Sequence, residues 1–323
     1  MNESNRFRLF AIFAIFASAL GMGIGHGQSP GRAITIVVPY SPGTGQDVLA
    51  RLIGEELQKK WGQAVVVDNK PGANGVIGSQ AVARAAPDGH TLLLTSTSFT
   101  TNLSLQKHVP YDPIKSFAPI VELAIGHLAL GVHPSVPANT TQEFIAYAKS
   151  QPGKLNYSSP GVGGPHHLAM ELFKQSTKTD LTHIPYKGTA GAVADLLGGH
   201  VNAGFVAIHV VMPMLSQVRL LGAAAKERPA VLPNLQTLDE QGVTGFNVTL
   251  WYALFAPAGT PPEIIKRYNT AINEMLVQPQ VAESLNRQGL TVVGGPPERL
   301  SQLVEREIGV WQKVVKEAGI TAE

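Results

Sequence analysis

Two segments far apart in the chain share one pattern, in which a short strand runs through a glycine-containing turn into a helix. In the first, the apolar residues 34–38 precede a turn at 39–44, and apolar residues recur at helical spacing from Val48 onward. The N–H groups of residues 45–47 then lie in the first helical turn, where they have no partner inside the helix. Such a turn either simply begins a capped helix or also binds an anion at the positive end of the helix dipole.

The second segment repeats this design. Residues 154–159 form a short strand, residues 160–164 form the turn, and Pro165 suits the first position of the helix that follows. In the first segment, Thr44 and Asp47 have the spacing of a capping box, which predicts reciprocal side-chain bonds at the start of the helix. Two such units in distant parts of one chain suggest two anion sites that face each other.

The rest of the chain alternates between strands and helices, which indicates an α/β fold with mostly parallel sheets. Ligands of such sheets bind beyond the carboxyl ends of the strands, and Tyr40, residues 96–98 and Ser159 all lie at such ends. The pattern fits two lobes, with the chain crossing near residue 131 and returning near residue 250. Further strands are expected at 64–67, 91–95, 120–125, 128–132, 181–185, 201–206, 220–224 and 250–256, and helices at 76–86, 141–150, 165–175, 189–197, 209–216, 261–277, 280–288 and 297–318.

Residues 1–27 have the pattern of an export signal. Arg6 and Arg8 precede the apolar residues 9–20, and small residues follow at 21–27. The apolar run is short for a membrane span, so we expect cleavage rather than an uncleaved anchor, and a periplasmic mature protein. The absence of cysteine excludes disulfides and thiolate chemistry, and the net charge of +2 without a basic block argues against nucleic-acid binding.

A series of motifs, in order from about residue 34 to the C-terminus, resembles the substrate-binding proteins of tripartite tricarboxylate transporters, the Bordetella uptake gene family. The resemblance implies a two-lobed fold of the type II periplasmic binding proteins, with a discontinuous lobe at 28–130 and 251–323 and a second lobe at 131–250. It also implies a receptor that closes on a small carboxylate and delivers it to membrane permease subunits. The motifs are Val38-Pro39-Tyr40 with Pro42-Gly43 and Asp47, Asn69 with Pro71-Gly72-Ala73 and Gly75, Pro87-Asp88-Gly89, Tyr111-Asp112-Pro113, Gly161 with Gly163 and His167, Pro185-Tyr186-Lys187-Gly188, and Trp251-Tyr252.

Family members bind one ligand carboxylate with main-chain N–H groups and waters of the two facing turns, in the cleft between the lobes. Carried over residue by residue, this implies a ligand-binding set of Tyr40, Ser41, Thr44, Gly45, Gln46, Asp47, Ser96, Thr97, Ser98, Ser159, Gly161, Val162, Gly163, Gly164 and His167. The second turn departs from the family pattern: Gly164 stands where a hydroxyl residue is usual, and Pro165 after it has no N–H.

Several side chains have two interpretations. His166, His167 and Glu171 could suggest a metal, but adjacent helical positions do not face one another, so no metal site is predicted. His167 could donate to a ligand or brace the turn. Asp47 could bind a ligand ammonium or only stabilise its helix. Lys187 is expected in solvent rather than as an anion clamp, and Trp251 and Tyr252 are expected to pack in the core or hinge rather than stack on a ligand.

The sequence contains no motif for a nucleophile elbow, a phosphate loop or a zincin, so we predict no catalytic residue and no cofactor. The leading hypothesis is a non-catalytic solute receptor. A ligand-sensing module for a membrane histidine kinase and a secreted hydrolase or isomerase are the alternatives. The ligand could be an aliphatic di- or tricarboxylate, an acidic amino acid or an aromatic acid, since each presents a carboxylate to the turns.

Overall fold

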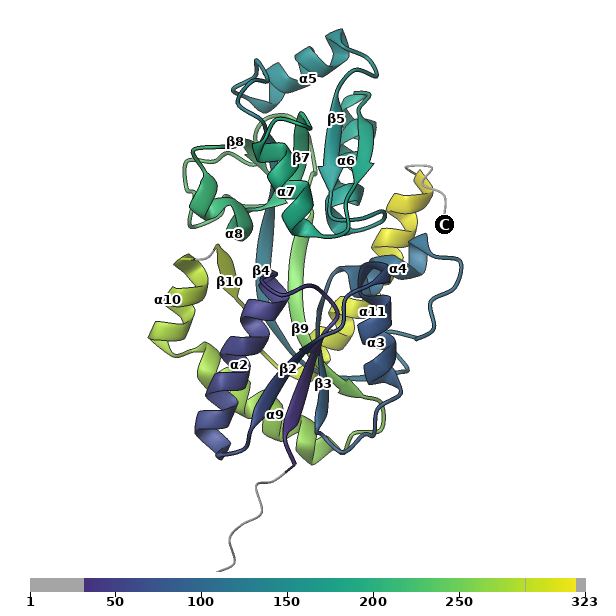
Figure 1. The fold of residues 1–323 in the computed structure, drawn as a ribbon, viewed down its shortest axis with the longest axis vertical. Coiled ribbons are helices and arrows are strands. Elements are labelled where there is room, and N and C mark those ends of the chain that lie inside the picture. The colour runs from purple at the N-terminus through teal and green to yellow at the C-terminus, as the bar shows by residue number, and fades with distance from the viewer. Residues whose placement is uncertain (1–31, 288, 318–323) are drawn as a thin grey trace, which may run out of the picture. The chain divides into compact units, whose positions relative to one another are not determined.

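The computed structural model describes residues 32–287 and 289–317. The predicted export signal at 1–27 lies outside the described residues. Within them, the strands form two groups that are joined by two long strands, and helices pack on both groups (Figure 1).

The first group contains three parallel strands, in the order β2-β1-β3. They are β1 (Ile34–Val38), β2 (Val65–Asn69) and β3 (Thr91–Ser96). The helices that connect and follow them are α2 (Gly45–Trp61), the short η1 (Ala73–Gly75), α3 (Val76–Ala83) and α4 (Ser98–Leu105). The sequence predicted the strands and α2, but it did not predict α4, which begins directly after β3.

The second group is built in the same way, from the parallel strands β5 (Asn156–Ser159), β6 (Thr182–Pro185) and β7 (Ala203–Ala207). β8 (Arg219–Ala223) pairs with β4 instead. The helices of this half are α5 (Thr141–Ser150), α6 (Pro165–Thr177), α7 (Thr189–Leu197), α8 (Ile208–Val211) and the short η2 (Met212–Met214). The predicted helix at 209–216 is therefore a four-residue helix followed by a 3₁₀ turn.

Two long antiparallel strands join these groups: β4 (Phe117–Val132) and β9 (Thr249–Pro257). The expectation of two separate strands at 120–125 and 128–132 is wrong. Gly126 and His127 continue the ladder with Leu250 and Thr249, so the glycine does not break the strand. Because β4 pairs with β7 of the second group and is joined through β9 to β3 of the first, separate lobes with boundaries near residues 131 and 250 stay a prediction.

The C-terminal part returns to the first group. It comprises α9 (Pro262–Leu276), α10 (Pro279–Arg287), β10 (Leu290–Val292), which pairs with β4, and α11 (Pro297–Glu317), which packs on α4 and β4. The sequence predicted the three helices and missed the three-residue strand.

The strand directions determine where a site can form. β3 is antiparallel to β9, β9 to β4, and β4 to β7. The parallel strands of the first group therefore run opposite to those of the second, and the carboxyl ends of both sets point toward the middle of β4 and β9 (Figure 1). This is where ligands of α/β sheets bind.

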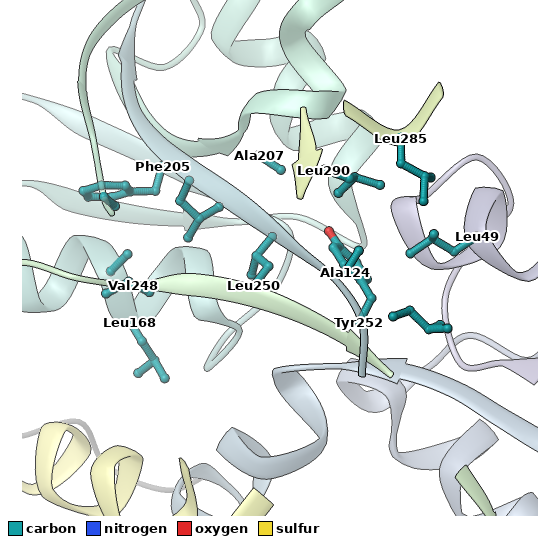
Figure 2. Close-up of a cluster of buried hydrophobic side chains, with 14 of the residues drawn as sticks. Leu49, Ala124, Leu168, Phe205, Ala207, Val248, Leu250, Tyr252, Leu285 and Leu290 are labelled. Carbon is teal, nitrogen blue, oxygen red and sulfur yellow. The ribbon is translucent and has the colours of Figure 1, made fainter. Parts of the chain in front are cut away.

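A single cluster of buried apolar side chains runs along β4 and β9 through both halves. Figure 2 shows part of it, with Leu250 and Tyr252 of β9 between residues of the second half, such as Phe205, and Leu49 of α2. Tyr252 is 2% exposed, in agreement with the prediction that it packs in the core.

Gly126 allows this packing, because a Cβ there would lie 3.0 Å from Cε2 and 3.2 Å from the hydroxyl of Tyr252. We expect Gly126→Ala to lower the free energy of unfolding by about 1–3 kcal/mol through overpacking. Gly309→Ala is the control, since Gly309 lies in α11 with no atom near its absent Cβ. This variant should raise the free energy of unfolding by up to about 1 kcal/mol. Urea unfolding measures the free energy of unfolding of both variants. An equal change in the two variants would contradict the tight contact between Gly126 and Tyr252.

Candidate functional site

The first turn is held by its own side chains, in a different way from the predicted capping box. Thr44 is the N-cap of α2 but makes no capping bond, and its hydroxyl donates to the carbonyl oxygen of Ser41 at 3.0 Å. The Asp47 carboxylate accepts from the N–H of Gly43, also at 3.0 Å, rather than from that of Thr44. The capping-box expectation is therefore wrong, because Gly43, at φ +80°, turns its N–H toward Asp47.

Asp47 is 3% exposed and has all its recorded partners on the first half of the chain. Arg51 binds both carboxylate oxygens, at 3.0 and 2.9 Å, and the Asn69 amide donates at 3.0 Å. Burial raises the pKa of Asp47, but the bonds from Arg51, Gly43 and Asn69 outweigh it and hold the pKa below its usual value. Asp47 thus stabilises the turn as an anion, and a contact with a ligand ammonium stays a prediction.

Polar side chains beside this turn form a chain of hydrogen bonds. The Gln46 amide donates to the Ser96 hydroxyl at 2.8 Å, and Ser96 donates to the Tyr40 hydroxyl at 3.3 Å. Ser96 pairs in register with Tyr252 of β9, so the network lies at the carboxyl end of β3. This network brings together three residues of the predicted ligand-binding set: Tyr40 of the first turn, Gln46 of α2 and Ser96 of β3.

The next two predicted residues begin α4. Thr97 is fully buried, and its hydroxyl accepts from the N–H of Trp251 at 3.1 Å, which ties the end of β3 to β9. Ser98 is the first residue of α4 and is 4% exposed. The hydroxyl of Thr97 is therefore engaged within the protein.

The second turn is also braced from within. The N–H of Gly163 donates to Nδ1 of His167 at 2.9 Å, so the bracing interpretation of His167 has a bond to support it. The Ser159 hydroxyl donates to the carbonyl oxygen of Gly161 at 2.9 Å and accepts from its N–H at 3.3 Å. Gly164 is the N-cap of α6, and Pro165 is its first residue, as predicted.

Three aromatic rings pack together beside the second turn, and two of them hydrogen-bond to it. The His183 ring stacks on both His167 and Tyr157, with ring centroids 4.1 and 4.8 Å apart, and the His167 and Tyr157 centroids are 6.3 Å apart. Nε2 of His183 is 2.7 Å from the Ser159 hydroxyl. This serine–histidine pair resembles a nucleophile with its base, but Ser159 is fully buried and its hydroxyl also bonds within the turn. The pair therefore holds the backbone of the turn.

The second turn also contacts the first half of the chain. Gly163 has φ +76°, and a Cβ there would lie 2.7 Å from Cδ1 of Leu105 in α4. The Thr101 hydroxyl donates to the carbonyl oxygen of Gly163 at 3.3 Å. Gly163 thus combines a left-handed backbone torsion with a close approach of another side chain. Val162, next to it, is among the exposed apolar residues.

Sequence reasoning missed His209, which lies against the start of α2. A Cβ on Gly45 would lie 2.7 Å from Nε2 of His209 and 3.1 Å from the Tyr252 hydroxyl, and these two atoms are 3.5 Å apart. His209 follows β7 by two residues, at the same sheet edge as Ser159. A polar residue directly after a parallel strand is the signal that could have found it.

The remaining candidates form no part of the two turns. Lys187 neighbours the second turn, because the N–H groups of Tyr186 and Gly188 donate to the carbonyl oxygens of Ser159 and Pro160. Lys187 is exposed, as expected. No group of three metal-ligating side chains occurs among residues 32–287 and 289–317. A groove of about 300 Å³ between α2 and α9 is lined by charged residues such as Lys60 and Glu274, at the opposite end of α2 from the first turn. It has no part in the arrangement of the two turns.

Residues 49–320 match the model of the tripartite tricarboxylate transporter family receptor. The chain belongs to this family. It is 36% identical to the protein BugT of Bordetella pertussis over 98% of both chains. A Rhodopseudomonas palustris protein solved with adipate has a TM-score of 0.88 at 34% identity, covering 91% of this chain and 100% of its own. MatC from the same organism, solved with malate, has a TM-score of 0.82 at 34% identity, covering 88% and 99%.

Membership of the receptor family confirms both the resemblance and the predicted α/β fold of the solute-binding type. The family is one of receptors rather than of enzymes. None of the helices in the described part of the chain combines the length and apolar character of a membrane span.

The aromatic stack predicts a pH dependence of stability. Burial, with a smaller contribution from His167, lowers the pKa of His183 to about 4, against an ordinary value of 6.5. Between these values the unfolded chain binds more protons than the folded one, so stability falls as the pH drops from 6.5 toward 4. One such group contributes at most about 1.4 kcal/mol per pH unit.

The test compares wild type with His183→Gln, which can still bond Ser159 but cannot take up a proton. Unfolding by urea between pH 6.5 and 4 should show a shallower loss of stability in the variant. Burial raises the pKa of Glu122 and Glu307, with the opposite effect on stability, but both proteins contain these residues, so they cancel in the difference. If the free energy of unfolding depended on pH equally in both proteins, the pKa of His183 would not be lowered by folding.

Proposed function

We propose that this chain is a periplasmic receptor that binds a small carboxylate between the turns 40–47 and 159–167 and delivers it to a membrane permease of the tripartite type. The observation that carries the proposal is the meeting of two glycine-rich helix starts at the facing carboxyl ends of two parallel strand sets. The relatives solved with adipate and malate support the carboxylate as ligand class.

Backbone donors account for the anion site. The N–H groups of residues 45–47 open α2, and those of His166 and His167 open α6, so none of them has a carbonyl partner four residues earlier within its helix. Charge-assisted bonds of this kind contribute about 1.5–3 kcal/mol each. Neither turn contains Arg or Lys, and the nearby Arg51 is already paired with Asp47. The ligand charge is then balanced by helix dipoles rather than by a fixed cation.

Delivery requires capture and release, and we propose that the two halves move as lobes that close on the ligand. The contacts of Gly163 with Leu105 and Thr101 join the second turn to α4 of the first half. Closure would exclude water from the turns and strengthen the bonds to the carboxylate.

The proposal predicts that binding depends on the second turn more than on any lysine. Gly163→Val should weaken the binding of the acid tenfold or more, since a side chain at this φ strains the turn and collides with Leu105. Lys187→Ala should leave affinity almost unchanged. Calorimetry with the tightest acid from a carboxylate panel that includes adipate and malate measures both.

Gly245→Val is the matched control for strain, because Gly245 has φ +73° but no atom within 4 Å of its absent Cβ. It should bind the acid as wild type does, and circular dichroism should show all three variants folded. Loss of binding in Lys187→Ala together with normal binding in Gly163→Val would replace the backbone site with a lysine clamp.

A further inference from the structure

His209 lies between the two turns without a role in holding either of them. Its Nε2 lies against Gly45, the first residue of α2, and is 3.5 Å from the Tyr252 hydroxyl. Its Nδ1 is buried and has no hydrogen-bond partner among the described residues. A buried polar atom without a partner is costly in a folded protein, which suggests that another molecule satisfies it.

His166 approaches the same place from the second half. It lies in the first turn of α6, beside a cavity of about 10 Å³, room for about one water, that is also lined by Pro160, Thr189 and Phe205. His209 is near enough to act on its pKa. His166 as a residue is half-buried. Two neighbouring imidazoles thus border the region where the turns meet.

We propose that His166 and His209 bind a second acidic group of the ligand, and that this binding takes up one proton from solvent onto the pair. The inference rests on the proposed function, in which the backbone of the turns binds the first carboxylate. A second carboxylate withdrawn from water needs donors or a positive charge, and the two turns contain neither lysine nor arginine. An imidazole that gains a proton supplies both a charge and a second N–H.

The free protein holds both imidazoles neutral. The pKa of each is lowered to about 4, chiefly by burial, and the proximity of His209 is a smaller cause of the lowered pKa of His166. An anion between the rings favours the protonated form and raises these pKa values. Affinity for the second acidic group should therefore increase as the pH falls from 7 toward 5.

Other titratable groups on the elements around the pair are neutral or already paired. Burial raises the pKa of Tyr252 and lowers that of His127, which contacts Thr291 at 3.3 Å. The acidic groups on α2 are Asp47, paired with Arg51, and Glu55 and Glu56 in the second half of the helix, both paired with Lys59. The acidic group on α6 is Glu171, bonded to Lys174. Of these groups, Tyr252 of β9 contacts the pair directly, with its hydroxyl 3.5 Å from Nε2 of His209.

The experiment uses matched acids that differ only in the second carboxylate: adipate with hexanoate, and succinate with butyrate. Calorimetry at pH 6 in two buffers of different ionisation enthalpy counts the protons exchanged. Wild type should take up close to one proton with the tighter-binding diacid and none with its monoacid. The diacid should bind at least tenfold more tightly at pH 5.5 than at pH 7.5.

His166→Gln and His209→Gln keep a neutral donor but cannot become charged. Each should abolish the proton uptake and weaken the diacid at least tenfold, while the monoacid changes less than threefold. His200→Gln is the control, since His200 is exposed and precedes β7, at the opposite end of that strand from His209. It should behave as wild type in every measurement.

The outcomes separate the two proposals. Monoacid and diacid binding with equal affinity, or diacid binding without proton uptake, would overturn the role of the histidine pair and leave the backbone carboxylate site intact. Failure of every acid to bind wild type would overturn the proposed function itself. Unchanged proton uptake in both glutamine variants would place the proton elsewhere and contradict this inference.

Discussion

The antiparallel pairing of β4 with β9 is the constraint on which the arrangement of the site depends. β3 and β7 join this pair from opposite sides, each antiparallel to its neighbour, so the two sets of parallel strands run in opposite directions. Their carboxyl ends consequently face each other, and the glycine turns that follow β1 and β5 lie at those ends. Tyr252, at the middle of β9, packs against Gly126 of β4 and Gly45 of α2, and so connects the strand pair to the first turn.

Charged and aromatic side chains near the site maintain the backbone of the turns. Asp47, Arg51 and Asn69 hold the first turn, and the stack of His167, His183 and Tyr157 holds the second. Because side chains hold the two turns in place, the main-chain N–H groups at the starts of α2 and α6 remain available to bind an anion. Donors that are already oriented need little reorganisation on binding, which lowers the entropic cost of holding a small ligand.

Much of this arrangement could be predicted from local sequence. The apolar run at 34–38, Pro165 and the positive φ of Gly163 follow from propensities that act within a few residues. The continuity of β4 through Gly126 could not, because it depends on pairing with β9, which is more than a hundred residues away. The meeting of Gly45 with His209 is of the same kind. The capping box failed because the positive φ of Gly43 redirected one N–H, which spacing alone does not reveal.

The central claim is that main-chain N–H groups of both turns bind the ligand carboxylate. A crystal structure of the protein with the tightest-binding acid tests it most directly. The account predicts a carboxylate oxygen within about 3.2 Å, directly or through one water, of N–H groups at the starts of both α2 and α6. A carboxylate paired with a lysine or arginine side chain, with both helix starts unoccupied, would contradict it.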